Sequence, residues 1–237
     1  MIPAFCVSRE THMLMTMDNP KVHAELIPEL LRSLPEEFHL NEIQIQQFEK
    51  YLNLLLQWNK KAGLISPSDE NRLIKRHIIE SLGVLSVNLL QPSAEVLDLG
   101  SGGGFPGVPI KISMPSLNMA LLDSRRMKAL FLEEVVRVLA LENTHVVNDR
   151  AERVAANLSE KFDFVLVRAV ADLETLWKWS QPLLKKGGSL LAQKGGDLKN
   201  ELDQLLHSHP NLQPKQFNYP KSRPIDPSRY VIAIQKD

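Results

Sequence analysis

The glycine-rich stretch from Glu95 to Pro109 contains the residue types most specific for chemistry in this chain. It reads EVLDLGSGGGFPGVP: an apolar run ends at Asp98, and glycines follow at positions 100, 102, 103 and 104. A buried strand that leads into a glycine-rich turn lets an α/β fold bring its backbone close to a ligand. Pro106 suits the first position of a following helix. The stretch therefore predicts a strand, a cofactor-binding turn and a helix.

Two cofactors fit the glycine spacing equally well. Gly102-x-Gly104-x-x-Gly107 matches the dinucleotide fingerprint, in which backbone N–H groups and a helix N-terminus hold a pyrophosphate. Asp98-x-Gly100-x-Gly102-x-Gly104 matches the pattern of S-adenosylmethionine-dependent methyltransferases, in which the glycines lie under the methionine and ribose parts of the cofactor. The turn alone does not distinguish the two.

Polar residues also end the later predicted strands. Asp123 can accept hydrogen bonds from ribose hydroxyls, and the backbone N–H of Ala151 with the Glu152 carboxylate can bracket an adenine. Arg168 and Lys194 end two further strands, where a cation can face a ligand or a nucleic acid. Each of these residues also has an ordinary structural explanation, as a helix cap or as a member of a surface ion pair.

The elements that must position these residues fall into two parts. Residues 24–90 have helical periodicity, with Leu26, Leu30, Leu31 and Leu34 predicted on one face and Asn41 predicted to cap a longer helix. Residues 91–237 alternate strand and helix signals, which predicts an α/β fold with a mostly parallel sheet covered on both faces and a possible antiparallel edge strand at the C-terminus. Residues 1–23 lack periodicity and are interpreted as a mobile tail.

Composition excludes several classes of protein. Apolar residues make up 43% of the 237 and charged residues 24%, which are globular values, and 28 cations balance 28 anions. Nucleic-acid binding would therefore need a local basic face. The single cysteine, Cys6, excludes an internal disulfide and a cysteine metal cluster and fits a reducing cytoplasm, while His207-x-His209 lacks partners at metal-site spacing. The absence of a membrane-length apolar run predicts a soluble protein, and the histidine spacing predicts no metal site.

A set of motifs, in this order, resembles the RsmG family, also called glucose-inhibited division protein B, which comprises bacterial small-subunit rRNA methyltransferases. The motifs are Trp58-Asn59-Lys60, Arg76-His77-Ile78-x-x-Ser81, the glycine stretch from Asp98 through Phe105-Pro106-Gly107, Leu122-Asp123-Ser124, Arg150-Ala151-Glu152, Arg168-Ala169 and Lys194-Gly195. The resemblance runs from about Phe48 to Lys236. It departs from the family pattern after Lys60 and at Met127-Lys128.

The resemblance implies a class I methyltransferase with a Rossmann-like, mostly parallel seven-stranded sheet and a helical N-terminal unit. It implies methyl transfer from S-adenosylmethionine to N7 of one guanosine in a loop of 16S rRNA, presented as free RNA or in the small ribosomal subunit. Separately from the resemblance, we expect a monomer. Matching positions imply a cofactor site made, with the glycine pattern, of Asp98, Gly100, Gly102, Gly104, Phe105, Asp123, Ala151, Glu152 and Arg168.

Guanine N7 carries an in-plane lone pair and no proton, so the reaction needs alignment and no general base. Arg168 and Lys194 are the candidates for positioning the substrate, by contact with guanine O6 or with phosphate. Candidates for the RNA face are Lys60, Lys61, Arg76, His77, Arg125, Arg126, Lys128, Arg223 and Arg229. Two alternatives are an NAD-dependent oxidoreductase, for which no hydride-transfer acid or base is identifiable, and a non-catalytic RNA- or ribosome-binding protein.

Overall fold

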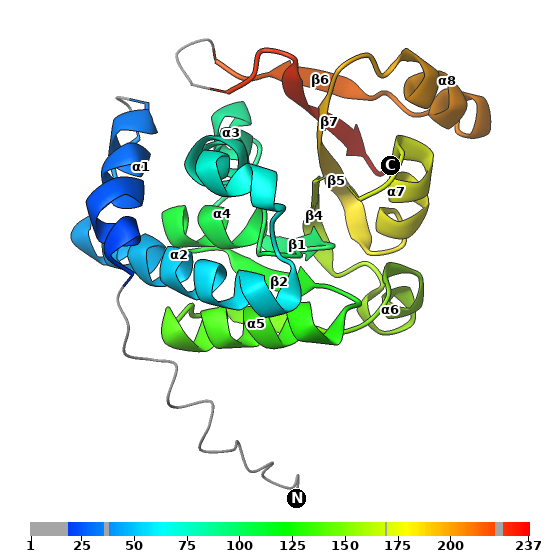
Figure 1. The fold of residues 1–237 in the computed structure, drawn as a ribbon. Coiled ribbons are helices and arrows are strands. Elements are labelled where there is room, and N and C mark those ends of the chain that lie inside the picture. Colours follow the sequence, from blue (N-terminus) through cyan, green and yellow to red (C-terminus); the bar gives the residue numbers. More distant parts are fainter. Residues whose placement is uncertain (1–18, 36–37, 169, 221–224) are drawn as a thin grey trace, which may run out of the picture.

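The computed structural model describes residues 19–35, 38–168, 170–220 and 225–237 (Figure 1). Most of the predicted tail lies outside these ranges, and its last residues belong to a helical segment that begins at Val22. No helix within the described ranges is long and apolar enough to cross a membrane.

The centre of the fold is a seven-stranded sheet in the order β3-β2-β1-β4-β5-β7-β6. The strands are β1 (Glu95–Leu99), β2 (Asn118–Leu122), β3 (Thr144–Val147), β4 (Phe162–Arg168), β5 (Leu184–Gly195), β6 (Lys215–Asn218) and β7 (Arg229–Gln235). Strands β1 to β5 are parallel, and β7 is antiparallel to both β5 and β6. The predicted α/β fold with a mostly parallel seven-stranded sheet is confirmed.

The predicted antiparallel edge strand at the C-terminus is wrong in one respect. The C-terminal strand β7 is antiparallel, but it lies inside the sheet, and β6 forms the edge. Strand β6 was not recognised because its four residues KQFN are mostly exposed and have no alternating apolar pattern. The buried β7, by contrast, has the continuous apolar run of an internal strand.

Helices cover both faces of the sheet, and neighbouring strand residues contribute to different cores (Figure 1). Val96 of β1 belongs to the core under α4 (Gly107–Ser113) and α5 (Arg126–Val138). Leu97 belongs to the opposite core, under α6 (Ala151–Leu158), α7 (Leu173–Ser180) and α8 (Lys199–Ser208). Helix α4 begins at Gly107, one residue later than predicted, because Pro106 is the residue that precedes it.

The helical N-terminal unit shares the first of these cores. Its elements are η2 (Val22–Leu26), α1 (Ile27–Ser33), α2 (Glu42–Ala62), η3 (Pro67–Arg72), η4 (Ile74–Ile79), α3 (Glu80–Gly83) and η5 (Val84–Val87). Asn41 caps α2 as predicted: its side chain accepts a hydrogen bond from the Gln44 backbone N–H, and the Gln44 side chain accepts one from that of Asn41. The predicted burial of Leu31 is wrong, because Leu26 and Leu30 define the inner face and Leu31, next in sequence, is 44% exposed.

Candidate functional site

The glycine turn joins β1 to α4 at the carboxyl edge of the parallel strands. The backbone N–H groups of Gly100 and Ser101 both donate to the carbonyl of Leu122, at 2.8 and 2.9 Å. These two bonds hold the turn against the end of β2. Gly100 has φ +78° and Gly104 has φ +91°, conformations that side-chain-bearing residues rarely adopt. A Cβ on Gly100 would lie 2.8 Å from Val170 Cγ2. Glycine is therefore required where the backbone borders the site.

Asp123, at the end of β2, holds the turn in place. Its Oδ2 accepts a hydrogen bond from the Gly102 backbone N–H at 2.9 Å, and its Oδ1 accepts one from the Arg125 backbone N–H at 2.8 Å. The residue is only 7% exposed. An ionised carboxylate has about four lone-pair positions. Each oxygen of Asp123 thus keeps the capacity to accept one more hydrogen bond, as a ribose hydroxyl would require.

A cavity of about 380 Å³ opens beside the turn at the ends of the first four strands. It brings together four of the predicted cofactor residues, namely Gly100, Asp123, Ala151 and Glu152. Helix α6 begins at Ala151, so its first backbone N–H groups have no partner within the helix and lie at the wall of this cavity. A larger hollow of about 690 Å³ lies between α7 and the C-terminus, but none of the predicted site residues that the structure describes lines it.

Asp98 lies beneath the turn. It is fully buried, and its Oδ2 accepts a hydrogen bond from the Gly107 backbone N–H at 2.9 Å. Burial raises the pKa of Asp98 to about 7. A Cβ on Gly107 would lie 2.6 Å from this Oδ2, so the carboxylate and the start of α4 fit only with glycine there. Asp98 braces the cofactor turn and is not among the described residues that line the cavity.

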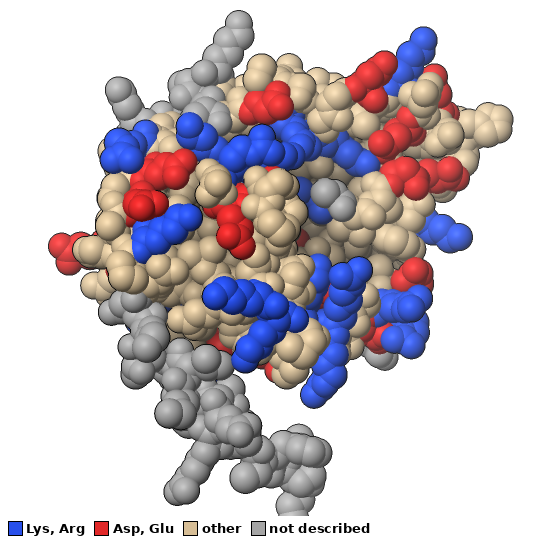
Figure 2. Space-filling view, viewed as in Figure 1, with Lys and Arg blue, Asp and Glu red and all other residues tan. Residues whose placement is uncertain are grey.

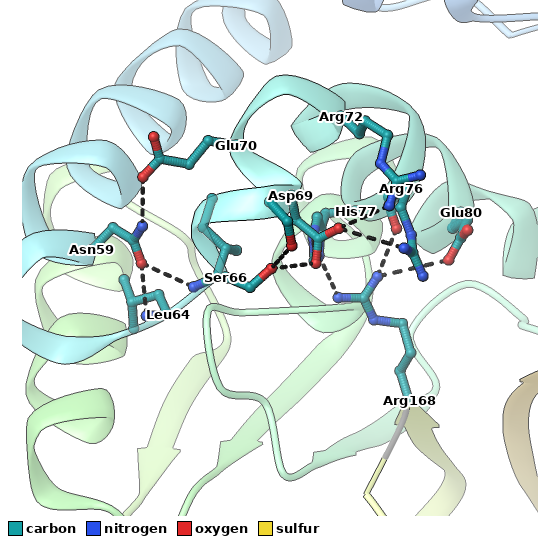
Figure 3. A network of polar contacts seen from close by, with 12 residues as sticks. Asn59, Leu64, Ser66, Asp69, Glu70, Arg72, Arg76, His77, Glu80 and Arg168 are labelled. Atoms are coloured by element: carbon teal, nitrogen blue, oxygen red, sulfur yellow. Dashed lines mark hydrogen bonds and ion pairs between the residues drawn. The ribbon is translucent and has the colours of Figure 1, made fainter.

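Arg168 crosses from the end of β4 to the N-terminal unit (Figure 3). It donates to the Arg76 carbonyl at 2.8 Å and to His77 Nδ1 at 2.6 Å, and it lies 3.9 Å from Glu80 Oε2. Its guanidinium carbon is 5.0 Å from the centre of the Phe105 ring. Arg168 and Phe105 were predicted to contact the cofactor; the structure places them together between the turn and the N-terminal unit.

Lys194, the second predicted substrate-positioning residue, links β5 to two other parts of the chain. Its Nζ donates to the Ala171 carbonyl and to Glu201 Oε2, both at 2.7 Å, and its side chain is 12% exposed. These contacts tie β5 to the segment after β4 and to α8. The contact with Glu201 agrees with the interpretation of Lys194 as a member of an ion pair.

The predicted RNA-face residues divide into exposed and engaged groups. Lys60, Lys61, Arg125 and Arg126 are exposed, and Lys128 is half-buried at the cavity. Figure 2 shows a hollow in this face of the molecule with Lys and Arg side chains on both sides of it. A local basic face therefore exists on a chain without net charge.

The other RNA-face candidates behave differently. The prediction that His77 lies on the exposed face is wrong, because its side chain is only 12% exposed and its ring centre lies 4.9 Å from that of Phe105. Arg76 is half-buried and lies 3.4 Å from Asp69, and Arg229 lies 4.0 Å from Glu80. Arg223 lies outside the described residues.

Sequence reasoning missed three side chains that build this region. Asp69 accepts a hydrogen bond from Ser66 Oγ at 2.9 Å and lies beside Arg76 and His77 (Figure 3). Tyr51 donates to the Gly103 carbonyl at 2.5 Å, and Glu80 faces Arg168 and Arg229. Tyr51 was detectable, because it lies three residues after the buried Phe48 on the same helix face.

Comparison with known proteins identifies relatives along most of the chain. The family model described as rRNA small subunit methyltransferase G matches residues 44–225. A protein of Desulforamulus reducens named ribosomal RNA small subunit methyltransferase G is 41% identical over 204 residues, covering 84% of this chain and 85% of the relative. A protein of the same name from Lachnoclostridium phytofermentans is 36% identical over 213 residues, covering 87% and 86%.

Solved structures agree in fold. A SAM-dependent methyltransferase from Aquifex aeolicus superposes with a TM-score of 0.51 at 16% identity, covering 72% of this chain and 97% of that one. A precorrin-6y C5,15-methyltransferase from Geobacter metallireducens gives a TM-score of 0.51 at 15% identity, covering 66% and 87%. At these identities the likeness establishes the methyltransferase fold alone. With the family match and the sequence relatives, it follows that this chain belongs to the rRNA small subunit methyltransferase G family.

Proposed function

We propose that this protein transfers a methyl group from S-adenosylmethionine to N7 of one guanosine in 16S rRNA. The observation that carries the proposal is the cavity at the ends of β1, β2, β3 and β4, where Gly100, Asp123 and Ala151 meet in a chain of this family. Ligands of open α/β sheets bind at this edge. The exposed cations around the hollow supply the local basic face that an RNA substrate needs.

The residues present fit S-adenosylmethionine. Asp123 has free acceptor capacity for ribose hydroxyls, and Ala151 and Glu152 offer a backbone donor and a carboxylate for the adenine edge. Gly100 lines the cavity with backbone alone, so it would border the methionine part. When bound, the cofactor supplies an electrophilic methyl group on a sulfonium. The protein's task is to hold that group in line with the acceptor nitrogen.

The substrate side requires orientation without proton transfer. Guanine N7 is a lone-pair nucleophile, so no residue has to act as a general base. Val170, 40% exposed at the cavity, and the end of β4 border the space next to Gly100 where a base taken out of its stack would enter. Phosphates of the surrounding RNA loop would be bound by exposed cations, namely Lys60, Lys61, Arg125 and Arg126.

The test is methyl transfer with tritiated S-adenosylmethionine. The acceptors are free 16S rRNA and small ribosomal subunits from a bacterium whose own enzyme of this family has been deleted. We expect label in 16S rRNA from at least one acceptor and none in free 23S rRNA, which serves as the control in a parallel reaction. Absence of label from every acceptor would contradict the proposed function.

Calorimetry separates the rival interpretations. We expect S-adenosylmethionine and S-adenosylhomocysteine to bind and NAD not to bind, and binding of NAD alone would support an oxidoreductase. The monomeric state and the cytoplasmic location belong to this proposal as well. Light scattering of the protein with and without RNA tests the first, and a single protein copy per RNA is the expected result.

A further inference from the structure

The side chain of His77 lies between two parts of the site that are far apart in the sequence. Its Nδ1 is 2.6 Å from Arg168 Nη2, and its ring is 4.9 Å from that of Phe105. Arg168 belongs to the end of β4, whereas Phe105 belongs to the glycine turn. One side chain of the N-terminal unit therefore contacts both the strand end and the turn that border the cavity.

The contact with Arg168 assigns the tautomer of His77. A guanidinium has donors only, so Nδ1 must accept the hydrogen bond and the ring proton must sit on Nε2. Nε2 lies 3.7 Å from Asp69 Oδ2 and has no hydrogen-bond partner among the described residues. Burial and the neighbouring Arg168 lower the pKa of His77 to about 4, which keeps the ring neutral at physiological pH. His77 is thus a fixed acceptor for Arg168.

The position of Arg168 affects the cavity because Val170 follows two residues later. Val170 lines the cavity and lies directly over Gly100. Arg168 has further partners in the Arg76 carbonyl, which belongs to η4 together with His77, and in Glu80, the first residue of α3 (Figure 3). Among these partners of Arg168, His77 also packs its ring against that of Phe105.

We propose that His77 is a positioning residue for methyl transfer: its Nδ1 lone pair fixes Arg168 against Phe105 and thereby sets the wall of the acceptor site next to Gly100. This inference rests on the proposed function. It gives the N-terminal unit a part in the reaction beyond binding RNA. Because His77 acts through Arg168, its loss is expected to slow the transfer step while leaving both ligands bound.

The test compares three substitutions at His77. Asparagine carries its amide oxygen at the same bond distance from Cβ as Nδ1, whereas the glutamine oxygen corresponds to Nε2 and leucine has no acceptor. Asparagine and glutamine both lose the aromatic ring, so their difference reports the acceptor. We expect H77N to keep kcat within about threefold of the wild type and H77Q and H77L to lose about 10- to 100-fold, with the KM for RNA and the Kd for S-adenosylmethionine changed less than about fivefold.

The exposed histidine of α8 supplies matched controls, because H207N and H207Q should both transfer at the wild-type rate. Equal rates for H77N and H77Q, or a full rate for H77L, would overturn the positioning role. If H77L does not fold, the asparagine and glutamine pair still decides. Inactivity of the wild type in every arm would refute the proposed function instead, so the two failures are distinguishable.

Discussion

Replacing Asp123 by asparagine is expected to weaken cofactor binding through the bonds that its two oxygens make. Oδ1 and Oδ2 accept the backbone N–H groups of Arg125 and Gly102 at 2.8 and 2.9 Å. An asparagine side chain offers one oxygen, and its NH₂ group would face an N–H donor. The variant therefore loses one of the two bonds, together with the charge that would hold a ribose hydroxyl.

The size of the effect follows from the worth of one charge-assisted hydrogen bond. Such a bond contributes about 1.5 to 3 kcal/mol. Loss of such a bond between the Asp123 carboxylate and a ribose hydroxyl raises the Kd for S-adenosylmethionine by about 10- to 150-fold. The turn itself is expected to be less stable, so the melting temperature of D123N should also fall by a few degrees.

Isothermal titration calorimetry with S-adenosylmethionine measures the change. Asp149 offers a matched control, because it lies on the rim of the same cavity but its carboxylate is bound to its own neighbours Arg150 and Arg153. D149N is expected to bind within about threefold of the wild type. Wild-type affinity in D123N, or an equal loss in D149N, would refute the assignment of Asp123.

Three further changes test other parts of the account. The double variant R125E/R126E should bind RNA more weakly and with a smaller salt dependence, while its affinity for S-adenosylmethionine stays within about threefold. Y51F leaves the buried Gly103 carbonyl without its 2.5 Å donor, so the free energy of unfolding should fall by about 1 to 3 kcal/mol in denaturant titrations. Burial raises the pKa of Asp98 to about 7, so the folded state holds its proton more tightly than the unfolded chain. The unfolding free energy of wild type relative to D98N should therefore fall as pH rises from about 4 to about 7, by up to about 4 kcal/mol.

Each of these changes has a result that would count against it. Lys199 and Lys215 are exposed cations on α8 and β6, so K199E/K215E is a charge-matched control for the arginine pair. Arg125 also lines the cavity, so equal loss of RNA and cofactor binding in R125E/R126E would contradict a role of the two side chains in RNA binding alone. Unchanged stability of Y51F would remove Tyr51 from the support of the turn. A flat or rising pH dependence of the D98N comparison would contradict the burial argument.

The parts predicted from sequence are those that local rules determine. The glycine turn, the strand-end Asp123 and the capping of α2 by Asn41 each depend on a few consecutive residues, and all three form as expected. Strand β6 was missed because a short, mostly exposed edge strand leaves no apolar alternation.

The network around Arg168 could not be predicted because it joins residues distant in sequence. Arg168 and His77 are 91 positions apart, and periodicity does not say which helix segment packs against which strand end. The position of a cation at a strand end therefore does not identify the residues that it contacts. The structure supplies the partners: His77 and the Arg76 carbonyl for Arg168, and Glu201 for Lys194.

Locating the modified atom tests directly whether the protein methylates guanine N7 in 16S rRNA. Borohydride reduction followed by aniline treatment cleaves the RNA strand at N7-methylguanosine. The same treatment does not cleave at a guanosine methylated on another atom. We expect one new cleavage site in 16S rRNA after reaction with the wild-type protein, and a much weaker one with D123N. Methyl label in 16S rRNA without such a cleavage site, or cleavage spread over many guanosines, would contradict this expectation.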